Sequence, residues 1–246
     1  MYVWNSFDIV LNTNTSAGNP TNNWVNLFGF SFAPHHQTNK RIRTLYITPY
    51  KAGTSDTLFD DAGTPNRKQM LRKFIKDAHS KDFRVEAVMG DPSWATPSGK
   101  ASGLARVQQV IDYNLSVNKN ERFDGVLLDI EPDVSTLSGW TGYTDFLSAV
   151  KVKYDSYNST NEPDMSYGDS ISPFYDNDSY SYTTIQGVMD RCSVVAIMSY
   201  YESGDGIVAR ASNEIRYGDT NKSNLCKTRF GVENYGWSFT RNNFIF

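Results

Sequence analysis

The chain has 246 residues, of which 39% are hydrophobic and 14% are aromatic, and its formal net charge at pH 7 is −3. This length suits one α/β barrel or two small domains. Charges of both signs are spread along the chain, which argues against a nucleic-acid partner, and no apolar run approaches the roughly 18 residues that span a membrane. The 15 tyrosines and 5 tryptophans favour surfaces that stack on ring-shaped ligands.

Segments with strand and helix patterns alternate along the chain, after a polar loop that is expected to reach residue 23. Alternating or buried apolar patterns predict strands at residues 1–4, 42–49, 84–89, 123–131, 165–173, 194–201 and 228–233. Apolar residues at helical spacing predict helices at residues 24–32, 65–80, 104–117, 143–157, 182–191 and 209–217.

A strand and a helix recur about every 30 to 40 residues, which indicates βαβ units and a parallel sheet. This pattern yields seven strands, whereas a (β/α)8 TIM barrel has eight. The sequence therefore predicts an α/β fold, a TIM barrel whose eighth unit is missing or truncated, with an open variant of the sheet as the alternative. No linker, repeat or low-complexity segment divides the chain, so residues 1–246 are expected to form a single domain.

The strand at 123–131 carries two carboxylates near its C-terminal end. Side chains alternate along a strand, so Leu127, Asp129 and Glu131 are expected on one face and the apolar residues between them on the other. A barrel interior that opens at its C-terminal rim would receive the acidic face, and that rim is where barrel enzymes hold their active sites. The negative charge of Asp129 would raise the pKa of Glu131, as a general acid at neutral pH requires.

Carboxylates and aromatic rings follow the ends of the other predicted strands as well. Aromatic rings pack on the apolar faces of sugars, and acids act at the glycosidic bond, so this combination predicts a sugar site. Several members also have a purely structural interpretation, in which Asp91 and Asp176 cap helices, Tyr200 packs in the core, and Trp94 and Trp237 only cover the barrel. The candidate residues are Tyr50, Asp91, Trp94, Asp129, Glu131, Tyr175, Asp176, Tyr200, Tyr201, Glu233 and Trp237.

Three partial motifs resemble those of glycoside hydrolase family 18, the chitinase-like TIM barrels. The fourth-strand pattern Asp-Gly-x-Asp-x-Asp-x-Glu of that family is matched by Asp124, Gly125, Asp129 and Glu131. The sixth-strand pattern Met-x-Tyr-Asp is similar to residues 198–201. The seventh-strand pattern Lys-x-x-x-Gly-[Ile/Val]-x-x-Tyr-Gly is matched at Lys227, Gly231, Val232, Tyr235 and Gly236.

The resemblance implies hydrolysis at an N-acetylhexosamine, with Glu131 as the general acid. The acetamido group of the substrate would be the internal nucleophile, positioned by Asp129 and Tyr200. The chain departs from the family pattern at Leu127 and Tyr201, where the family has aspartates.

Three alternatives stay open at this point. The pair Glu131 and Glu233 is similar to the acid/base and nucleophile of retaining barrel glycosidases, and a carboxyl separation of about 5 Å would favour that mechanism. Leu127 and Tyr201 suggest instead a carbohydrate-binding barrel without catalysis. A divalent metal held by Asp91, Asp129 and Glu131 is a third possibility. The chain also resembles uncharacterised glycosidase-like barrels with Asp-x-Glu-Pro on the fourth strand.

The remaining expectations concern cofactors, assembly and location. No cofactor or metal-binding motif is present, the histidines are interpreted as surface residues, and a monomer that acts on a carbohydrate is expected. Cys192 and Cys226 precede two neighbouring strands, where a disulfide is within reach. Such a bond would favour a secreted or cell-envelope protein, although the chain shows no signal peptide.

Overall fold

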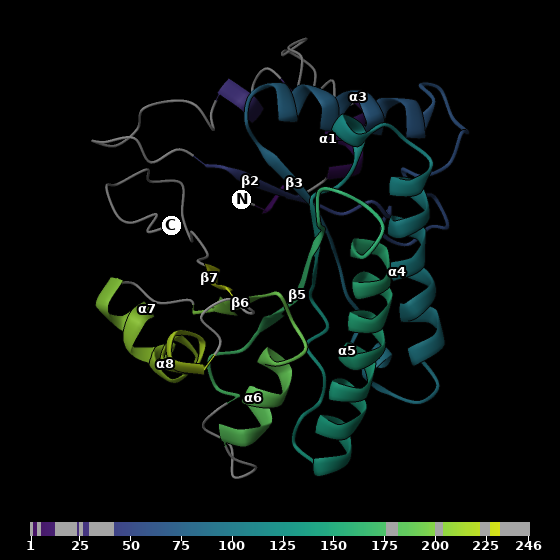
Figure 1. Cartoon of the computed structure of the whole chain (residues 1–246). Coiled ribbons are helices and arrows are strands. Elements are labelled where there is room, and N and C mark those ends of the chain that lie inside the picture. The colour runs from purple at the N-terminus through teal and green to yellow at the C-terminus, as the bar shows by residue number, and fades with distance from the viewer. Residues whose placement is uncertain are drawn as a thin grey trace. The chain divides into compact units, whose positions relative to one another are not determined.

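The structure is a computed structural model that describes residues 2–3, 6–12, 24, 27–29, 42–175, 182–199, 204–221 and 227–231. Within these residues, strands and helices alternate along the chain (Figure 1). The strands are β1 (Tyr2–Val3), β2 (Thr44–Ile47), β3 (Arg84–Met89), β4 (Gly125–Leu128), β5 (Ser166–Ile171), β6 (Val194–Met198) and β7 (Lys227–Gly231). The helices are α1 (Ser6–Leu11), α3 (Arg67–Ser80), α4 (Lys100–Leu115), α5 (Leu137–Asn158), α6 (Tyr182–Met189), α7 (Gly204–Arg210) and α8 (Ser212–Asn221).

The predicted α/β class is confirmed, and each predicted strand is found within a few residues of its expected bounds. One loop prediction and one helix prediction were wrong. The segment expected to be a polar loop contains α1, because Phe7 and Val10 are three residues apart and both are buried. The helix expected at 209–217 is two helices, α7 and α8. Closure into an eight-stranded barrel remains a prediction.

The chain divides into two compact units built from interleaved segments. The first unit comprises residues 1–89, 106–126 and 157–165, and the second comprises residues 90–105, 127–156 and 166–246. Each unit is described below by itself.

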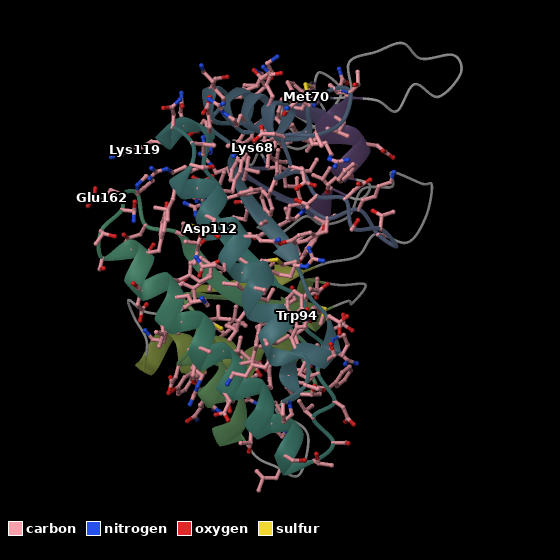
Figure 2. The ribbon with its side chains drawn as sticks, turned by 90° about the vertical axis from the view of Figure 1, so that its right-hand side faces the viewer. Lys68, Met70, Trp94, Asp112, Lys119 and Glu162 are labelled. Carbon is pink, nitrogen blue, oxygen red and sulfur yellow. The ribbon has the colours of Figure 1, made fainter. Side chains whose placement is uncertain are left out.

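In the first unit, β1, β2 and β3 pair in parallel, with Leu45 opposite Val85. Helix α3 begins after Asn66, whose side-chain oxygen accepts the Gln69 N–H at 2.8 Å. Its buried face consists of Leu71, Phe74, Ile75 and Ala78, and its other faces carry residues such as Lys68 and Met70 (Figure 2). Helix α3 therefore forms for the reason the sequence indicates, an apolar stripe at helical spacing that packs against α1 and β3.

Two asparagines tie the end of a helix to the start of the following strand. The Asn114 side chain, near the end of α4, donates to the Phe123 carbonyl at 2.9 Å and accepts the Phe123 N–H at 2.9 Å. The Asn158 side chain, at the end of α5, makes the same two bonds to Met165, at 3.0 and 2.9 Å. Each side-chain amide thus bonds to the N–H and the carbonyl of one residue, as the backbone of a neighbouring strand would. These two peptide groups would otherwise lack hydrogen bonds.

His79, interpreted from the sequence as a surface residue, is half-buried and hydrogen-bonded. Its side chain is 20% exposed, and its two ring nitrogens lie 2.9 Å from the Asn120 carbonyl and 2.9 Å from the Asp124 carboxylate. Burial acts to lower the pKa of His79, but the hydrogen bond and charge of Asp124 outweigh it and the pKa is raised. Asp124 also accepts the Val85 N–H at 2.7 Å, so His79 supports the start of the β3 strand region.

In the second unit, β5, β6 and β7 pair in parallel, with Asp169 opposite Val195 and Gly168 opposite Val194. Helix α8 contacts both α6 and β7. The largest buried side chains of this unit include Trp140, Tyr143 and Phe146, all from α5. No described helix is sufficiently long and apolar to span a bilayer.

Candidate functional site

The predicted acidic pair follows the end of β4. The strand ends at Leu128, Asp129 is half-buried, and Glu131 is exposed. Glu131 has a φ of 46°, in the left-handed region, so strand alternation does not extend to it. Asp129 therefore stands close to the sheet, while Glu131 lies in the segment that leaves it.

Asp129 has a raised pKa of about 6. Burial is the main cause, the charge of Glu131 adds to it, and a hydrogen bond from the Ser170 side chain acts in the opposite direction. The negative charge of Glu131 thus acts on Asp129, so the two carboxylates lie near each other. Asp129 therefore keeps its proton up to about pH 6.

Gly90, the residue after β3, is in close contact with the backbone of Asp129. A Cβ placed on Gly90 would lie 1.7 Å from the Asp129 carbonyl oxygen and 2.1 Å from its carbonyl carbon. Only glycine fits at this position, so the approach of these two backbones helps to determine where Asp129 lies.

The site contains a third carboxylate that the sequence analysis missed. Asp169, inside β5, is 0% exposed, accepts the Tyr143 hydroxyl at 2.5 Å and accepts the Ile130 N–H at 3.3 Å. Burial raises the pKa of Asp169 to about 8, against the lowering effect of these hydrogen bonds. The sequence feature that could have identified Asp169 is its position, as an acidic residue in the middle of a strand that is otherwise buried.

Aromatic side chains surround these carboxylates. Tyr175 is 9% exposed and contacts Trp140 edge to face, with 5.3 Å between ring centres. Burial raises the pKa of Tyr175, as do the charges of Asp169, Glu131 and Asp129. The predicted candidate Tyr175 is thus close to the acidic group but largely covered.

Phe174, beside Tyr175, is the exposed ring at the end of β5. Its exposed fraction is 55%, and the Arg210 guanidinium of α7 lies 4.8 Å from its ring centre. Phe174 was not among the candidate residues predicted from the sequence. A local sequence pattern does not show which of two adjacent aromatic residues will be exposed.

Asp91 has the capping role that was considered for it, and Trp94 is buried. The Asp91 side chain accepts the Ser93 N–H at 2.8 Å and caps the short 3-10 helix Pro92–Ala95, and this hydrogen bond lowers the pKa of Asp91. Trp94 is 7% exposed, and its ring centre lies 5.9 Å from that of Phe146. A role of either residue in substrate binding remains a prediction.

Tyr50 belongs to the first unit, whereas the carboxylates described above belong to the second. Its hydroxyl lies 3.0 Å from the Gln109 side-chain oxygen, and the Arg106 guanidinium lies 4.2 Å from its ring centre. Tyr50 therefore packs against α4, and its predicted contact with substrate remains untested.

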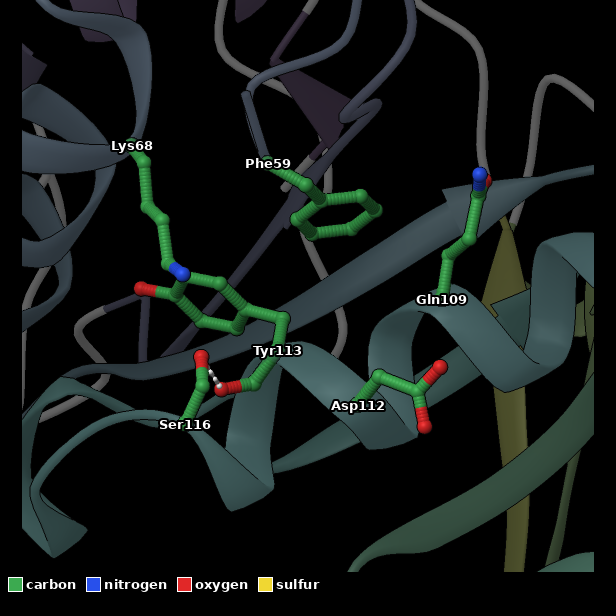
Figure 3. Close-up of a pocket in the computed structure, with 6 residues that line it drawn as sticks. All are labelled: Phe59, Lys68, Gln109, Asp112, Tyr113 and Ser116. Atoms are coloured by element: carbon green, nitrogen blue, oxygen red, sulfur yellow. Dashed lines mark hydrogen bonds between the residues drawn. The ribbon is translucent and has the colours of Figure 1, made fainter. Parts of the chain in front are cut away.

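The first unit also has a pocket of about 310 Å³ next to α4 (Figure 3). Its polar side chains already have partners, since Asp112 accepts a hydrogen bond from Gln108 and Tyr113 donates one to the Glu121 carbonyl. The pocket is lined by Phe59, Lys68, Gln109, Asp112, Tyr113 and Ser116. None of the sequence candidates is among these residues.

The other candidates lie outside the described residues, so the separation of Glu131 from Glu233 and the predicted disulfide are not tested. Cys192 is buried two residues before β6, as expected, but its predicted partner is not described. Candidates outside the described ranges are Asp176, Tyr200, Tyr201, Cys226, Glu233 and Trp237.

The metal alternative receives no support from the described carboxylates. Within the described ranges, no three His, Cys, Asp or Glu side chains are grouped so that they could hold a metal ion. Asp91, Asp129 and Glu131, which all lie in those ranges, do not form such a group.

Comparison with known proteins bears on the fold. No protein-family model matches the chain, and no curated protein is similar to it in sequence. The C-terminal domain of a protein provisionally named as a chitinase, from Desulfitobacterium hafniense DCB-2, matches with a TM-score of 0.50 and 12% identity, over 76% of this chain and 56% of that one. The chain has a divergent chitinase-like fold.

Other solved structures match at lower TM-scores. A class V chitinase mutant from Nicotiana tobaccum matches with a TM-score of 0.48 and 10% identity, over 75% of this chain and 59% of that one. An endo-beta-1,4-mannanase from Cellulomonas fimi matches with a TM-score of 0.44 and 10% identity, over 77% and 49%. The chain thus spans less than two thirds of the length of these proteins.

Proposed function

We propose that the chain is a glycoside hydrolase that acts on a polysaccharide or glycan, with Asp129 and Glu131 as its acidic pair. The observation that supports this most is the placement of two carboxylates, the half-buried Asp129 and the exposed Glu131, directly after the end of β4. Two neighbouring carboxyl groups in different environments can divide glycoside hydrolysis between them, one as the proton donor and one beside the sugar ring.

In this proposal, Glu131 is the proton donor, because it is the exposed member of the pair and can reach the glycosidic oxygen. Proton transfer to that oxygen allows the bond to the anomeric carbon to break. Asp129 then lies beside the positive charge that develops on the sugar ring, and its carboxylate stabilises that charge. The acetamido oxygen of the substrate, positioned by Asp129 and Tyr200, forms the new bond to the anomeric carbon, or the Glu233 carboxylate does so if the substrate has no acetamido group. Water then attacks the anomeric carbon, Glu131 takes up the proton of that water, and the sugar is released with a new hydroxyl.

Aromatic side chains supply the sugar-binding surface in this proposal. Phe174 presents an exposed ring shortly after β5, and the adjacent Tyr175 lies within reach of the charges of the acidic pair. An exposed ring beside carboxylates is typical of surfaces that pack on pyranose faces. Since a polysaccharide does not enter cells unaided, we place the reaction in the cell envelope or outside the cell.

The direct test is release of reducing ends from a panel of oligosaccharides and polysaccharides, including oligomers of N-acetylglucosamine and β-linked mannans. We expect cleavage of at least one class. Stereochemical analysis of the product would then separate the mechanism that uses Glu233 as nucleophile from an inverting one. A panel that yields no product at any pH would contradict the proposal.

A second candidate is a carbohydrate-binding protein without turnover. Leu127 favours it, because this side chain is 0% exposed at the position where the chitinase-like motif has an aspartate. This alternative predicts binding of a glycan in calorimetry with no product, and unchanged affinity in Glu131→Gln.

The pH profile of hydrolysis is expected to depend on the acidic pair. Because Asp129 acts as a carboxylate and loses its proton near pH 6, kcat/KM should rise as pH rises through about 6. In Asp129→Asn no group titrates at this position, so this rise should be absent. Initial rates between pH 4 and 8, at about unit intervals, measure this; an identical profile in the variant would exclude Asp129 as the titrating group.

A further inference from the structure

Asp169 is a buried acid without a role in the reaction outlined above. It lies in the interior of β5, opposite Val195 of β6, and is 0% exposed. A carboxylate in such a place costs free energy unless its oxygens are hydrogen-bonded, and both of its oxygens are. Its contacts therefore indicate what it does.

One oxygen of Asp169 holds the segment that carries the acidic pair. The Asp169 Oδ1 accepts the N–H of Ile130 at 3.3 Å, and Ile130 is the residue between Asp129 and Glu131. Strand β4 has already ended at Leu128, and Ile130 is 0% exposed. The Asp169 side chain thus satisfies a buried backbone donor just beyond the strand, where the chain turns into the left-handed conformation of Glu131.

The other oxygen of Asp169 is fixed from α5. The Tyr143 hydroxyl donates to Asp169 Oδ2 at 2.5 Å, and Tyr143 is itself 0% exposed. With one partner on each oxygen, the carboxyl group has a defined orientation. Through these two hydrogen bonds, Asp169 connects Tyr143 of α5 to the backbone of Ile130.

Strand β5 holds Asp129 from a second direction as well. Asp169 and Ser170 are consecutive in the strand, so their side chains point to opposite faces. Ser170 forms a hydrogen bond with the Asp129 side chain, while Asp169 bonds to the backbone one residue later. Two neighbouring residues of β5 therefore restrain both the side chain of Asp129 and the peptide that follows it.

We propose that Asp169 is a positioning residue for the glycosidase reaction, which fixes the Asp129–Glu131 segment through the Ile130 amide and is itself oriented by Tyr143. This inference rests on the proposed function. It assigns Asp169 no contact with substrate. Its effect is on the geometry of the acidic pair, and a displacement of about 1 Å in such a pair reduces turnover strongly.

The charge state of Asp169 follows from its surroundings. The ionisable groups that face it and Tyr143 are Asp129, Tyr175 and Cys192, and Glu131 acts on Asp129 in turn. All of these are acidic or neutral, and burial raises the pKa of Asp169 to about 8. Asp169 is therefore mostly neutral at pH 7, which avoids a further negative charge beneath Asp129.

The experiment compares Asp169→Asn, Asp169→Ala and Tyr143→Phe with a control, Ile171→Ala, which removes another fully buried side chain of β5. Asparagine keeps an acceptor for the Ile130 N–H and a neutral charge, so kcat at pH 6 should stay within about threefold of the parent. Alanine removes the acceptor, so kcat should fall at least about tenfold with KM within about twofold. Ile171→Ala should lower stability and leave kcat near that of the parent.

Two measurements are independent of activity. Amide hydrogen exchange at Ile130, followed by NMR, should accelerate in Asp169→Ala and in Tyr143→Phe more than in Asp169→Asn. The second measurement is the melting temperature. Because the folded pKa of Asp169 is raised above its unfolded value near 4, the stability that it contributes is complete below about pH 4 and is lost as pH rises to about 8. Asp169→Asn should therefore gain in melting temperature relative to the parent across this range.

The outcomes separate this inference from the proposed function. If no glycan is cleaved but Ile130 exchange behaves as expected, the positioning role stands and the glycosidase proposal fails. If hydrolysis is found but Asp169→Ala keeps the kcat of the parent, or if the Asn and Ala variants lose kcat equally, Asp169 does not position the pair. If Asp169→Ala does not fold, unchanged Ile130 exchange in Tyr143→Phe overturns the inference.

Discussion

Gly90→Ala is expected to lower the free energy of unfolding by about 3 kcal/mol or more, as estimated for overpacking in a rigid interior. The added Cβ would lie 1.7 Å from the Asp129 carbonyl oxygen and 2.8 Å from the Asp129 Cα, all of them backbone atoms. No rotation of a side chain relieves such a contact, so the two backbones must separate. Chemical denaturation followed by circular dichroism measures the loss.

A matched control is Gly187→Ala, within α6. The nearest atom to a Cβ at Gly187 is a guanidinium nitrogen of Arg191 at 3.5 Å, an ordinary van der Waals contact. Alanine stabilises a helix interior by up to about 1 kcal/mol relative to glycine, so this variant should be as stable as the parent or more so. If Gly90→Ala unfolded at the same denaturant concentration as Gly187→Ala, the close approach of Gly90 to Asp129 would be wrong.

Glu131→Gln should reduce glycan hydrolysis by about 100-fold or more, because general acid catalysis contributes at least that factor and glutamine has no proton to donate. The substitution preserves the shape of the side chain. Since Glu131 is exposed, the variant should unfold at a temperature close to that of the parent. Reducing-end release at pH 5.5, with saturating substrate, measures the change in kcat.

The control for this variant is Glu162→Gln, which changes an exposed glutamate of the first unit in the same way. It should hydrolyse the same glycan at the rate of the parent. Equal rates in the two variants would remove Glu131 from the mechanism and favour a binding protein without turnover. Retained glycan affinity in Glu131→Gln, with turnover lost, is the result that supports its role as the proton donor.

The fold was predictable from the sequence wherever apolar residues repeat with a clear period. Strand β3 has the predicted bounds, and α3 lies within its predicted range and buries apolar residues that recur at intervals of three and four. Helix α5 begins earlier than predicted, at Leu137, because Gly139 and Gly142 weaken the helical pattern. Gly142 is needed there, since a Cβ would lie 2.1 Å from the Ala95 carbonyl oxygen.

The candidate site was predictable only in part, because its geometry depends on contacts between segments far apart in the chain. Asp129 and Glu131 were found from their spacing in one strand. Asp169 was not, since its significance comes from Tyr143 and Ile130, which are 26 and 39 residues away in sequence. The sequence analysis also expected the raised pKa at Glu131, whereas burial, which depends on the fold, places a raised pKa on Asp129.

The asparagine that links α4 to Phe123 limits how the chain can be produced. Asn114 begins an Asn-Leu-Ser triplet, the acceptor sequence for N-linked oligosaccharides. In the folded protein its amide is inaccessible and both of its polar atoms are engaged. A sugar chain attached during synthesis in a eukaryotic secretory pathway would occupy that amide before Phe123 reached it, so expression hosts that lack this modification are the suitable ones.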